Sequence, residues 1–203
     1  MISTTVDLLR HGQCVGGEIV RGAIDVELTD EGWQQMRMSV ESSSANWQRI
    51  VSSPLKRCRL FASTIANERQ LPLTIIDDLR EISFGAWEGR KWSDIALEEP
   101  EKMRDFWALE SGVSPAGGES LASFNHRCKS GLNEVLDSHN GENILCVTHG
   151  GTIRMLLADT LGTVHASDPW DVPYACYSRL SYSQGDEQRR FGRVVFHNRL
   201  STI

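Results

Sequence analysis

Two short apolar runs in this chain are each followed directly by a histidine and a glycine. The first run covers residues 4–9 and leads into Arg10 and His11; the second covers residues 144–148 and leads into His149. Short runs of branched and apolar residues bounded by glycine predict buried strands. Because ligands bind at the carboxyl ends of strands in α/β sheets, we expect both histidines in one site. The fold must therefore bring together two strand ends that lie far apart in the sequence.

Predicted strands and helices alternate along the rest of the chain. Further strands are expected at 49–52, 73–76, 177–183 and 192–197, the last two forming a hairpin around 184–186. Helices are expected at about 30–43, 54–68, 92–98, 100–110, 121–136 and 151–161. In the helix at 54–68, Ser53 is expected as the N-cap and Pro54 as the first helical residue. In the helix at 151–161, the apolar face contains Ile153, Leu156, Leu157 and Leu161. The alternation predicts a three-layer α/β/α sandwich with a mostly parallel central sheet.

The length of 203 residues suits one domain, and we expect a single domain over 1–203. A less regular, tryptophan-containing stretch at about 84–115 interrupts the alternation. We expect this stretch to be a helical insertion that caps the substrate pocket. Within it, Trp87, Arg90, Lys91 and Trp107 are candidates for the pocket wall, although tryptophans in such a stretch also serve as core residues.

Composition excludes several classes of protein. The net charge of −6 argues against a nucleic-acid or membrane-surface partner, because no uniformly basic face is expected. No apolar run approaches the ~18 residues that a membrane span requires. The five cysteines are scattered and odd in number, which predicts free thiols in a reducing compartment. With no signal peptide at the start, we expect a cytoplasmic protein; the oligomeric state leaves no sign in the sequence.

Two further charged residues lie where a site at the strand ends would use them. Arg57 is near the start of the helix that follows the strand at 49–52, and helix N-termini attract anions. It can equally be a solvated surface charge. Glu81 follows the strand at 73–76 and is either an ordinary loop carboxylate or a catalytic acid.

The motifs together resemble those of a known family. They are Arg-His-Gly, Ser-Ser-Pro-Leu-x-Arg, Glu-Ile-x-Phe-Gly-x-Trp-Glu-Gly, Gly-Gly-Glu-Ser and Thr-His-Gly-Gly, in this order. The chain is similar to the histidine phosphatase superfamily, in its phosphoglycerate-mutase-like branch. Within that branch it looks most like bacterial α-ribazole-5′-phosphate phosphatases. The resemblance covers nearly the whole chain.

The resemblance implies a role for each matching residue. His11 is the nucleophile that takes the phosphoryl group, Arg10 and Arg57 hold the phosphate oxygens, and His149 contacts the same phosphate. Glu81 is the general acid. Three further substrate-binding residues are expected: Gln13, Gly22 and Gly150. Neither a metal ion nor a cofactor is expected, since the arginines supply the charge that phosphoryl transfer requires.

The chain departs from the family pattern near its first motif. Gln13 replaces the usual glutamate, and Gly17 stands where many members have asparagine. Gly17 therefore lacks a side-chain contact to phosphate. Arg21 either compensates for this loss or faces solvent.

These features predict a phosphomonoesterase that acts on a small phosphorylated metabolite, with α-ribazole 5′-phosphate of cobalamin synthesis as the first candidate. The alternatives are a phosphoglycerate mutase, a broad-specificity sugar-phosphate phosphatase and a non-catalytic module that binds a phosphorylated ligand. Mutases usually carry a longer insertion between the glutamate motif and the second histidine, which favours hydrolysis here. The Cys-x5-Arg, Walker A and His-Glu-x-x-His signatures are missing from the sequence.

Overall fold

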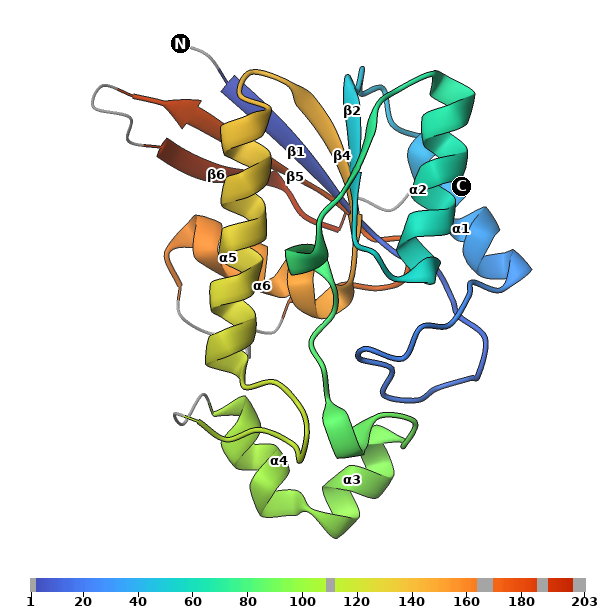
Figure 1. The fold of residues 1–203 in the computed structure, drawn as a ribbon, viewed down its shortest axis with the longest axis vertical. Helices are drawn as coiled ribbons and strands as arrows, with labels where there is room; N and C mark the ends of the chain where they lie inside the picture. The colour runs from blue at the N-terminus through green and yellow to red at the C-terminus, as the bar shows by residue number, and fades with distance from the viewer. Residues whose placement is uncertain (1–2, 109–111, 164–169, 186–189, 199–203) are drawn as a thin grey trace.

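The computed structural model describes residues 3–108, 112–163, 170–185 and 190–198. Its central sheet has the strand order β3-β2-β4-β1-β5-β6 (Figure 1). The strands are β1 (Ser3–Arg10), β2 (Arg49–Ser52), β3 (Leu73–Ile75), β4 (Asn143–Thr148), β5 (Tyr177–Gln184) and β6 (Arg190–Phe196). The strands β3, β2, β4 and β1 are parallel, and β5 and β6 are antiparallel at one edge. The prediction of a mostly parallel sheet is confirmed.

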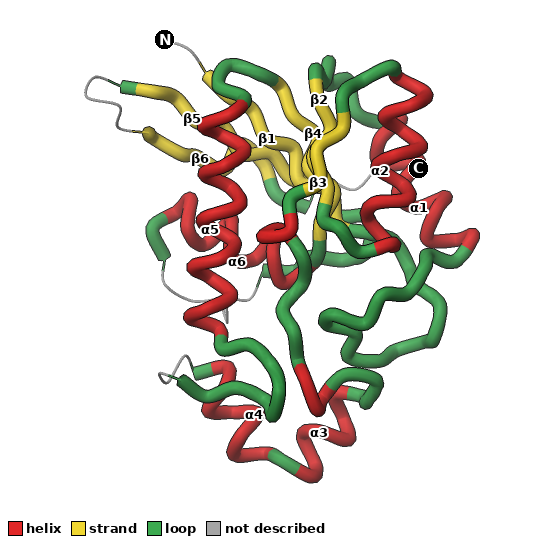
Figure 2. The backbone as a smooth tube through the Cα atoms, viewed as in Figure 1, coloured by secondary structure: helices red, strands yellow, loops and turns green. Residues whose placement is uncertain are grey.

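Helices cover both faces of this sheet (Figures 1 and 2). They are α1 (Asp30–Glu41) and α2 (Lys56–Arg69) on one face, and α5 (Leu121–Ser138) and α6 (Gly150–Leu161) on the other. Leu145 and Val147 of β4 pack with α1 and α2, whereas Ile144 and Cys146 pack in the core under α5 and α6. Successive side chains point to opposite faces, so a strand covered on both sides is a continuous apolar run. This confirms the three-layer α/β/α sandwich.

Two local predictions were wrong. The helix α2 begins at Lys56 with Leu55 as N-cap, and no side chain caps it. Ser53 is buried and bonds elsewhere, as described below. Leu161, expected on the buried face of α6, is 47% exposed. It is the last residue of the helix, just before Gly162 ends it in the left-handed conformation (φ 69°), and the core no longer covers it.

The short helices α3 (Trp92–Glu98) and α4 (Pro100–Trp107) lie beyond the ends toward which the parallel strands point (Figure 1). Residues 84–107, called the aromatic segment here, bring five rings together with centroids 5.0–6.3 Å apart. These rings are Phe84, Trp87, Trp92, Phe106 and Trp107. Trp87 is fully buried and belongs to the core. The segment is thus a small apolar unit beside the carboxyl ends of the strands.

The five cysteines are all free and all buried. No helix in the described part of the chain is both long enough and apolar enough to cross a membrane. The tip of the predicted β5–β6 hairpin at Asp186 lies outside the described residues.

Candidate active site

The register of β1 and β4 brings the two histidines together. Arg10 pairs with Thr148 in the parallel ladder, and the His11 amide donates to the Thr148 carbonyl over 3.0 Å. His11 and His149 therefore leave the sheet at the same edge, and their ring centroids are 5.3 Å apart. The fold thus places side by side two histidines that lie 138 positions apart in the sequence.

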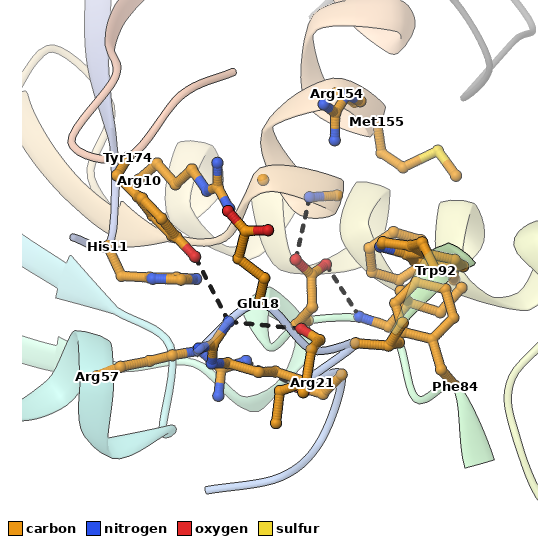
Figure 3. Close-up of a pocket in the computed structure, with 18 of the residues that line it drawn as sticks. Arg10, His11, Glu18, Arg21, Arg57, Phe84, Trp92, Arg154, Met155 and Tyr174 are labelled. Atoms are coloured by element: carbon orange, nitrogen blue, oxygen red, sulfur yellow. Dashed lines mark hydrogen bonds between the residues drawn. The ribbon is translucent and has the colours of Figure 1, made fainter. Parts of the chain in front are cut away.

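A cavity of about 480 Å³ opens at this edge (Figure 3). Its lining includes five cationic side chains, namely Arg10, Arg21, Arg57, Lys91 and Arg154. Two carboxylates, Glu18 and Glu81, also line it. Figure 3 shows Arg10, His11 and Tyr174 on one side and Phe84 and Trp92 on the opposite side. The cavity thus has a cationic end and an aromatic end.

His11 faces the cavity as a neutral imidazole. Its Nδ1 lies 2.9 Å from the Gly12 carbonyl, which only accepts, so Nδ1 carries the proton. The lone pair is then on Nε2, which has no hydrogen-bond partner among the described residues. Burial, followed by the charges of Arg57 and Arg10, holds the pKa of His11 well below its usual value. An unprotonated ring nitrogen is therefore available to attack at neutral pH.

His149 is fully buried, and both of its ring nitrogens have hydrogen-bond partners. Arg57 Nε donates to His149 Nδ1 over 3.2 Å, so the remaining ring proton is on Nε2, which lies 2.6 Å from Ser53 Oγ. Burial and the Arg57 charge hold the pKa of His149 well below its usual value. His149 is not among the residues that line the cavity. Its ring contacts Arg57 and lies beside the ring of His11.

Arg57 is not a solvated surface charge. It is 1% exposed, and its two terminal nitrogens donate to the carbonyls of Ile24 and Gly22 over 2.7 Å each. Gly22 has a positive φ of 51°, and an added Cβ would lie only 2.9 Å from the Ile82 carbonyl oxygen, so this position favours glycine. Arg57 forms no ion pair with any carboxylate in the described residues. The cavity therefore holds a fixed and uncompensated guanidinium.

Arg10 is held between a carbonyl and an aromatic ring. Its Nη1 donates to the Val172 carbonyl over 2.5 Å, and its guanidinium carbon lies 4.4 Å from the Tyr174 ring centroid. Its Nε is buried close against Gly150 and has no hydrogen-bond partner in the described part of the chain. A buried donor without an acceptor costs about 1–3 kcal/mol. An anion in the cavity would bring additional acceptors to this end of the site.

Glu81 is fixed through both carboxylate oxygens. One accepts from its neighbour Ile82 N and the other from Gly151 N at the start of α6, each over 3.1 Å. A side chain at Gly151 would come within 2.4 Å of the carboxylate, so glycine permits this approach. The carbonyls of Arg80 and Glu81 accept from Arg127, which forms a largely buried ion pair with Glu119 at 2.7 Å.

The remaining predicted residues divide into two groups. Gly22 and Gly150 line the cavity, as does Lys91 of the proposed cap. Gln13 does not: its side-chain oxygen accepts from Thr29 Oγ1 over 3.1 Å, at the start of α1. Arg90 also turns away and pairs with Glu98 and Glu99. Among the described residues, no three His, Cys, Asp or Glu side chains are grouped as metal ligands.

Sequence reasoning missed several residues of this site. Tyr174, Arg154 and Trp92 line the cavity, and Ser53 supports His149. Ser53 lies inside a recognised motif, and that was the available signal for its role. Tyr174 and Arg154 reach the cavity through contacts between distant segments, which no local spacing encodes.

Several known proteins are similar to this chain. A bifunctional protein of Mycobacterium tuberculosis is 34% identical over 158 residues, covering 76% of this chain and 43% of that protein. The chain therefore spans less than half the length of that relative. Phosphoserine phosphatase 1 of Hydrogenobacter thermophilus is 32% identical over 87% of this chain and 83% of its own length. The adenosylcobalamin/α-ribazole phosphatase of Escherichia coli is 27% identical, covering 87% of this chain and 89% of that protein.

A solved structure, mycobacterial hydrolase 2, superposes with a TM-score of 0.88. It is 25% identical and covers 100% of this chain and 94% of that one. The sequence profile of branch 1 of the histidine phosphatase superfamily matches residues 6–192. This chain therefore belongs to branch 1 of the histidine phosphatase superfamily.

Proposed function

We propose that this protein is a phosphomonoesterase that works through a phosphohistidine at His11 and needs no metal ion. The observation that carries this proposal is the neutral His11, whose unpartnered Nε2 faces a cavity lined by guanidinium groups. Phosphoryl transfer is mainly a matter of positioning and electrostatic stabilisation. Arg10 and Arg57 supply both, because planar guanidinium groups bind phosphate oxygens through charge-assisted hydrogen bonds.

In the first step, His11 Nε2 forms a bond to phosphorus while the bond from phosphorus to the ester oxygen breaks. Glu81 delivers a proton to the departing oxygen, which would otherwise leave as an alkoxide. The proton stays on His11 Nδ1, and its hydrogen bond to the Gly12 carbonyl stabilises the positive charge of the phosphorylated ring. The alcohol product leaves the cavity.

In the second step, a water oxygen forms a bond to phosphorus and the bond to Nε2 breaks. Glu81, now a carboxylate, takes the proton of that water, and the electron pair returns to His11. Covalent catalysis of this kind replaces one difficult step by two easier ones. His149 contributes by holding Arg57 and packing beside His11; direct contact with the phosphoryl group would require it to exchange its present hydrogen bonds.

The aromatic end of the cavity favours a substrate whose alcohol part is large and apolar. Six apolar side chains line it, namely Phe84, Trp92, Trp107, Leu121, Phe124 and Met155. Aromatic rings stack well on a planar base. We therefore propose α-ribazole 5′-phosphate as the substrate and cobalamin synthesis as the setting. The relatives named α-ribazole phosphatase support this choice, while those named phosphoserine phosphatase provide the main competing substrate.

A phosphate-release assay tests the proposal. The panel contains α-ribazole 5′-phosphate, phosphoserine, a sugar phosphate and 3-phosphoglycerate, with wild type compared with His11→Ala and with the exposed-histidine control His126→Ala. We expect phosphate release by wild type and the control, fastest on α-ribazole 5′-phosphate, and none by His11→Ala. Isomerisation of 3-phosphoglycerate without phosphate release would indicate a mutase. Equal inactivity of wild type and His11→Ala on the whole panel would indicate a binding module.

A further inference from the structure

Arg21 turns its guanidinium into the cavity, toward Tyr174 (Figure 3). It comes from the loop between β1 and α1 and belongs to none of the family motifs. Within this loop it donates to four backbone carbonyls, those of Cys14, Val15, Gly17 and Ile19. The cation is thereby fixed at the cavity wall rather than free in solvent.

The charge of Arg21 is not compensated by a carboxylate. It forms no ion pair within the described part of the chain, although Glu18 lines the same cavity. Its Nε is buried and has no hydrogen-bond partner among the residues that the structure describes. Backbone carbonyls orient a guanidinium without neutralising it. The cation thus retains its attraction for an anion in the cavity.

Tyr174 links Arg21 to the residues around His11. Its hydroxyl accepts from Arg21 Nη1 over 3.4 Å, and its ring lies against Arg10. The same ring is 5.9 Å from the ring of His11. The two arginines therefore flank one tyrosine next to the nucleophile.

A further cation at this end of the cavity would add to the charge that Arg10 and Arg57 supply. Three nitrogens of Arg57 already donate hydrogen bonds, to His149, Ile24 and Gly22. His149 is not among the residues that line the cavity. Gly17 has no side chain to offer. The transferring phosphoryl group carries negative charge on three equatorial oxygens.

We propose that Arg21 is a third phosphate-binding guanidinium of this site and that Tyr174 is the positioning residue that aims it. This inference rests on the proposed phosphatase function and adds a residue to it. It also explains how the chain tolerates glycine at position 17.

The test compares Arg21→Gln, Arg21→Lys and Tyr174→Phe, with Arg37→Gln as the control for an arginine far from the cavity. Competitive inhibition constants for inorganic phosphate and orthovanadate are measured against p-nitrophenyl phosphate. We expect Arg21→Gln to raise both constants about tenfold and to lower kcat/KM about 100-fold, as loss of one donor to a phosphoryl group does. Arg21→Lys should recover part of the lost affinity and activity. Tyr174→Phe should raise the inhibition constants about 3-fold, and Arg37→Gln should leave them unchanged.

A pH profile separates phosphate binding from simple bracing of the loop. The charged and titratable groups around His11 are Arg10, Arg21, Arg57, His149, Tyr174 and Cys14. Removing the Arg21 charge should raise the pKa of His11 and move the acid limb of kcat/KM to higher pH, and Arg21→Lys should leave the limb in place. An unmoved limb in Arg21→Gln would make Arg21 a loop brace and overturn the inference.

Two outcomes distinguish this inference from the function on which it rests. If wild type binds phosphate and vanadate but the Arg21→Gln constants stay within twofold, this inference alone is wrong. If wild type binds neither anion and releases no phosphate, the proposed function fails. Should Arg21→Gln not fold, as judged by circular dichroism, the Tyr174→Phe constants decide: values equal to wild type would overturn the role of the Arg21–Tyr174 contact.

Discussion

The two ends of the cavity are built on different principles. At the cationic end, side chains are fixed by polar contacts from separate elements, as Arg57 is by His149, Ile24 and Gly22. At the aromatic end, the contacts are ring packing within the aromatic segment, with centroids 5.0–6.3 Å apart. Polar networks hold a precise geometry, whereas ring packing tolerates change in shape. The difference suggests that one end carries the reaction and the other selects the alcohol.

One residue joins the two ends. Glu88 Oε1 accepts from Ala23 N over 2.8 Å, in the loop that presents Gly22 to Arg57. The same oxygen accepts from Phe84 N over 2.9 Å, at the start of the aromatic segment. Glu88 therefore sets the position of the cationic end relative to the aromatic end.

The largest expected effect comes from the cationic end. Arg57→Gln removes a buried cation that holds His149 and lines the cavity, and we expect kcat/KM to fall about 1,000-fold on every substrate. Steady-state hydrolysis of p-nitrophenyl phosphate measures this loss. Arg59→Gln, two residues along the same helix, is the matched control because the Arg59 side chain bonds to the Pro54 carbonyl and does not line the cavity in the described structure. A loss below tenfold would contradict the central position given to Arg57.

Glu88→Ala should weaken both ends together. Because its oxygen holds the loop at Ala23 as well as Phe84, we expect kcat/KM to fall about 30-fold on small and aromatic esters alike, from the loss of two to three hydrogen bonds. Glu88→Gln keeps an acceptor oxygen at the same place and should retain most of the activity. A loss confined to aromatic esters would show that Glu88 serves the aromatic segment alone.

At the aromatic end, Trp92→Ala should change selectivity more than catalysis. We expect kcat/KM for α-ribazole 5′-phosphate to fall about tenfold, since ring stacking contributes about 1.4 kcal/mol. The value for phosphoserine should stay within about twofold, because a small substrate leaves the stacking surface unused. Leu97→Ala is the control, because Leu97 lies on the same helix and is 82% exposed. Equal losses of kcat/KM on both substrates would contradict the proposal that the aromatic end selects the alcohol part of the substrate.

The smallest expected effect is on stability. The pKa values of His11 and His149 are lowered in the folded protein, so the folded state binds fewer protons than the unfolded chain below about pH 6.5. The free energy of unfolding should therefore fall as pH drops from 7 to 5, by up to about 1.4 kcal/mol per unit for each histidine. Urea unfolding measures this dependence. Between pH 7 and 5, the free energy of unfolding should fall less in His11→Asn than in wild type, and as much as in wild type in the exposed control His126→Asn. Identical slopes for wild type and His11→Asn would contradict the buried, neutral state of His11.

The sequence predicted best the features that local pattern encodes. Apolar runs ending in His-Gly located the ends of β1 and β4, and helical periodicity located the buried face of α5. The family motifs identified four residues that line one cavity in the structure, namely Arg10, His11, Arg57 and Glu81. Each of these signals lies in adjacent or periodically spaced residues.

Features that depend on long-range contacts were not predictable in this way. The orientation of the His149 ring follows from its bonds to Arg57 and Ser53, about 90 residues earlier in the chain. Tyr174 reaches Arg21 across 153 positions in the sequence. Whether Arg21 pointed inward or outward depended on carbonyls that only the folded loop presents.

Trapping the covalent intermediate examines the proposed mechanism most directly. Enzyme mixed with a ³²P-labelled phosphomonoester is quenched in alkali within milliseconds, digested, and the labelled peptide is sequenced. We predict an acid-labile, alkali-stable label on the peptide that contains His11, and no label in His11→Ala. A label on any other side chain, or turnover with no labelled protein at all, would contradict the account.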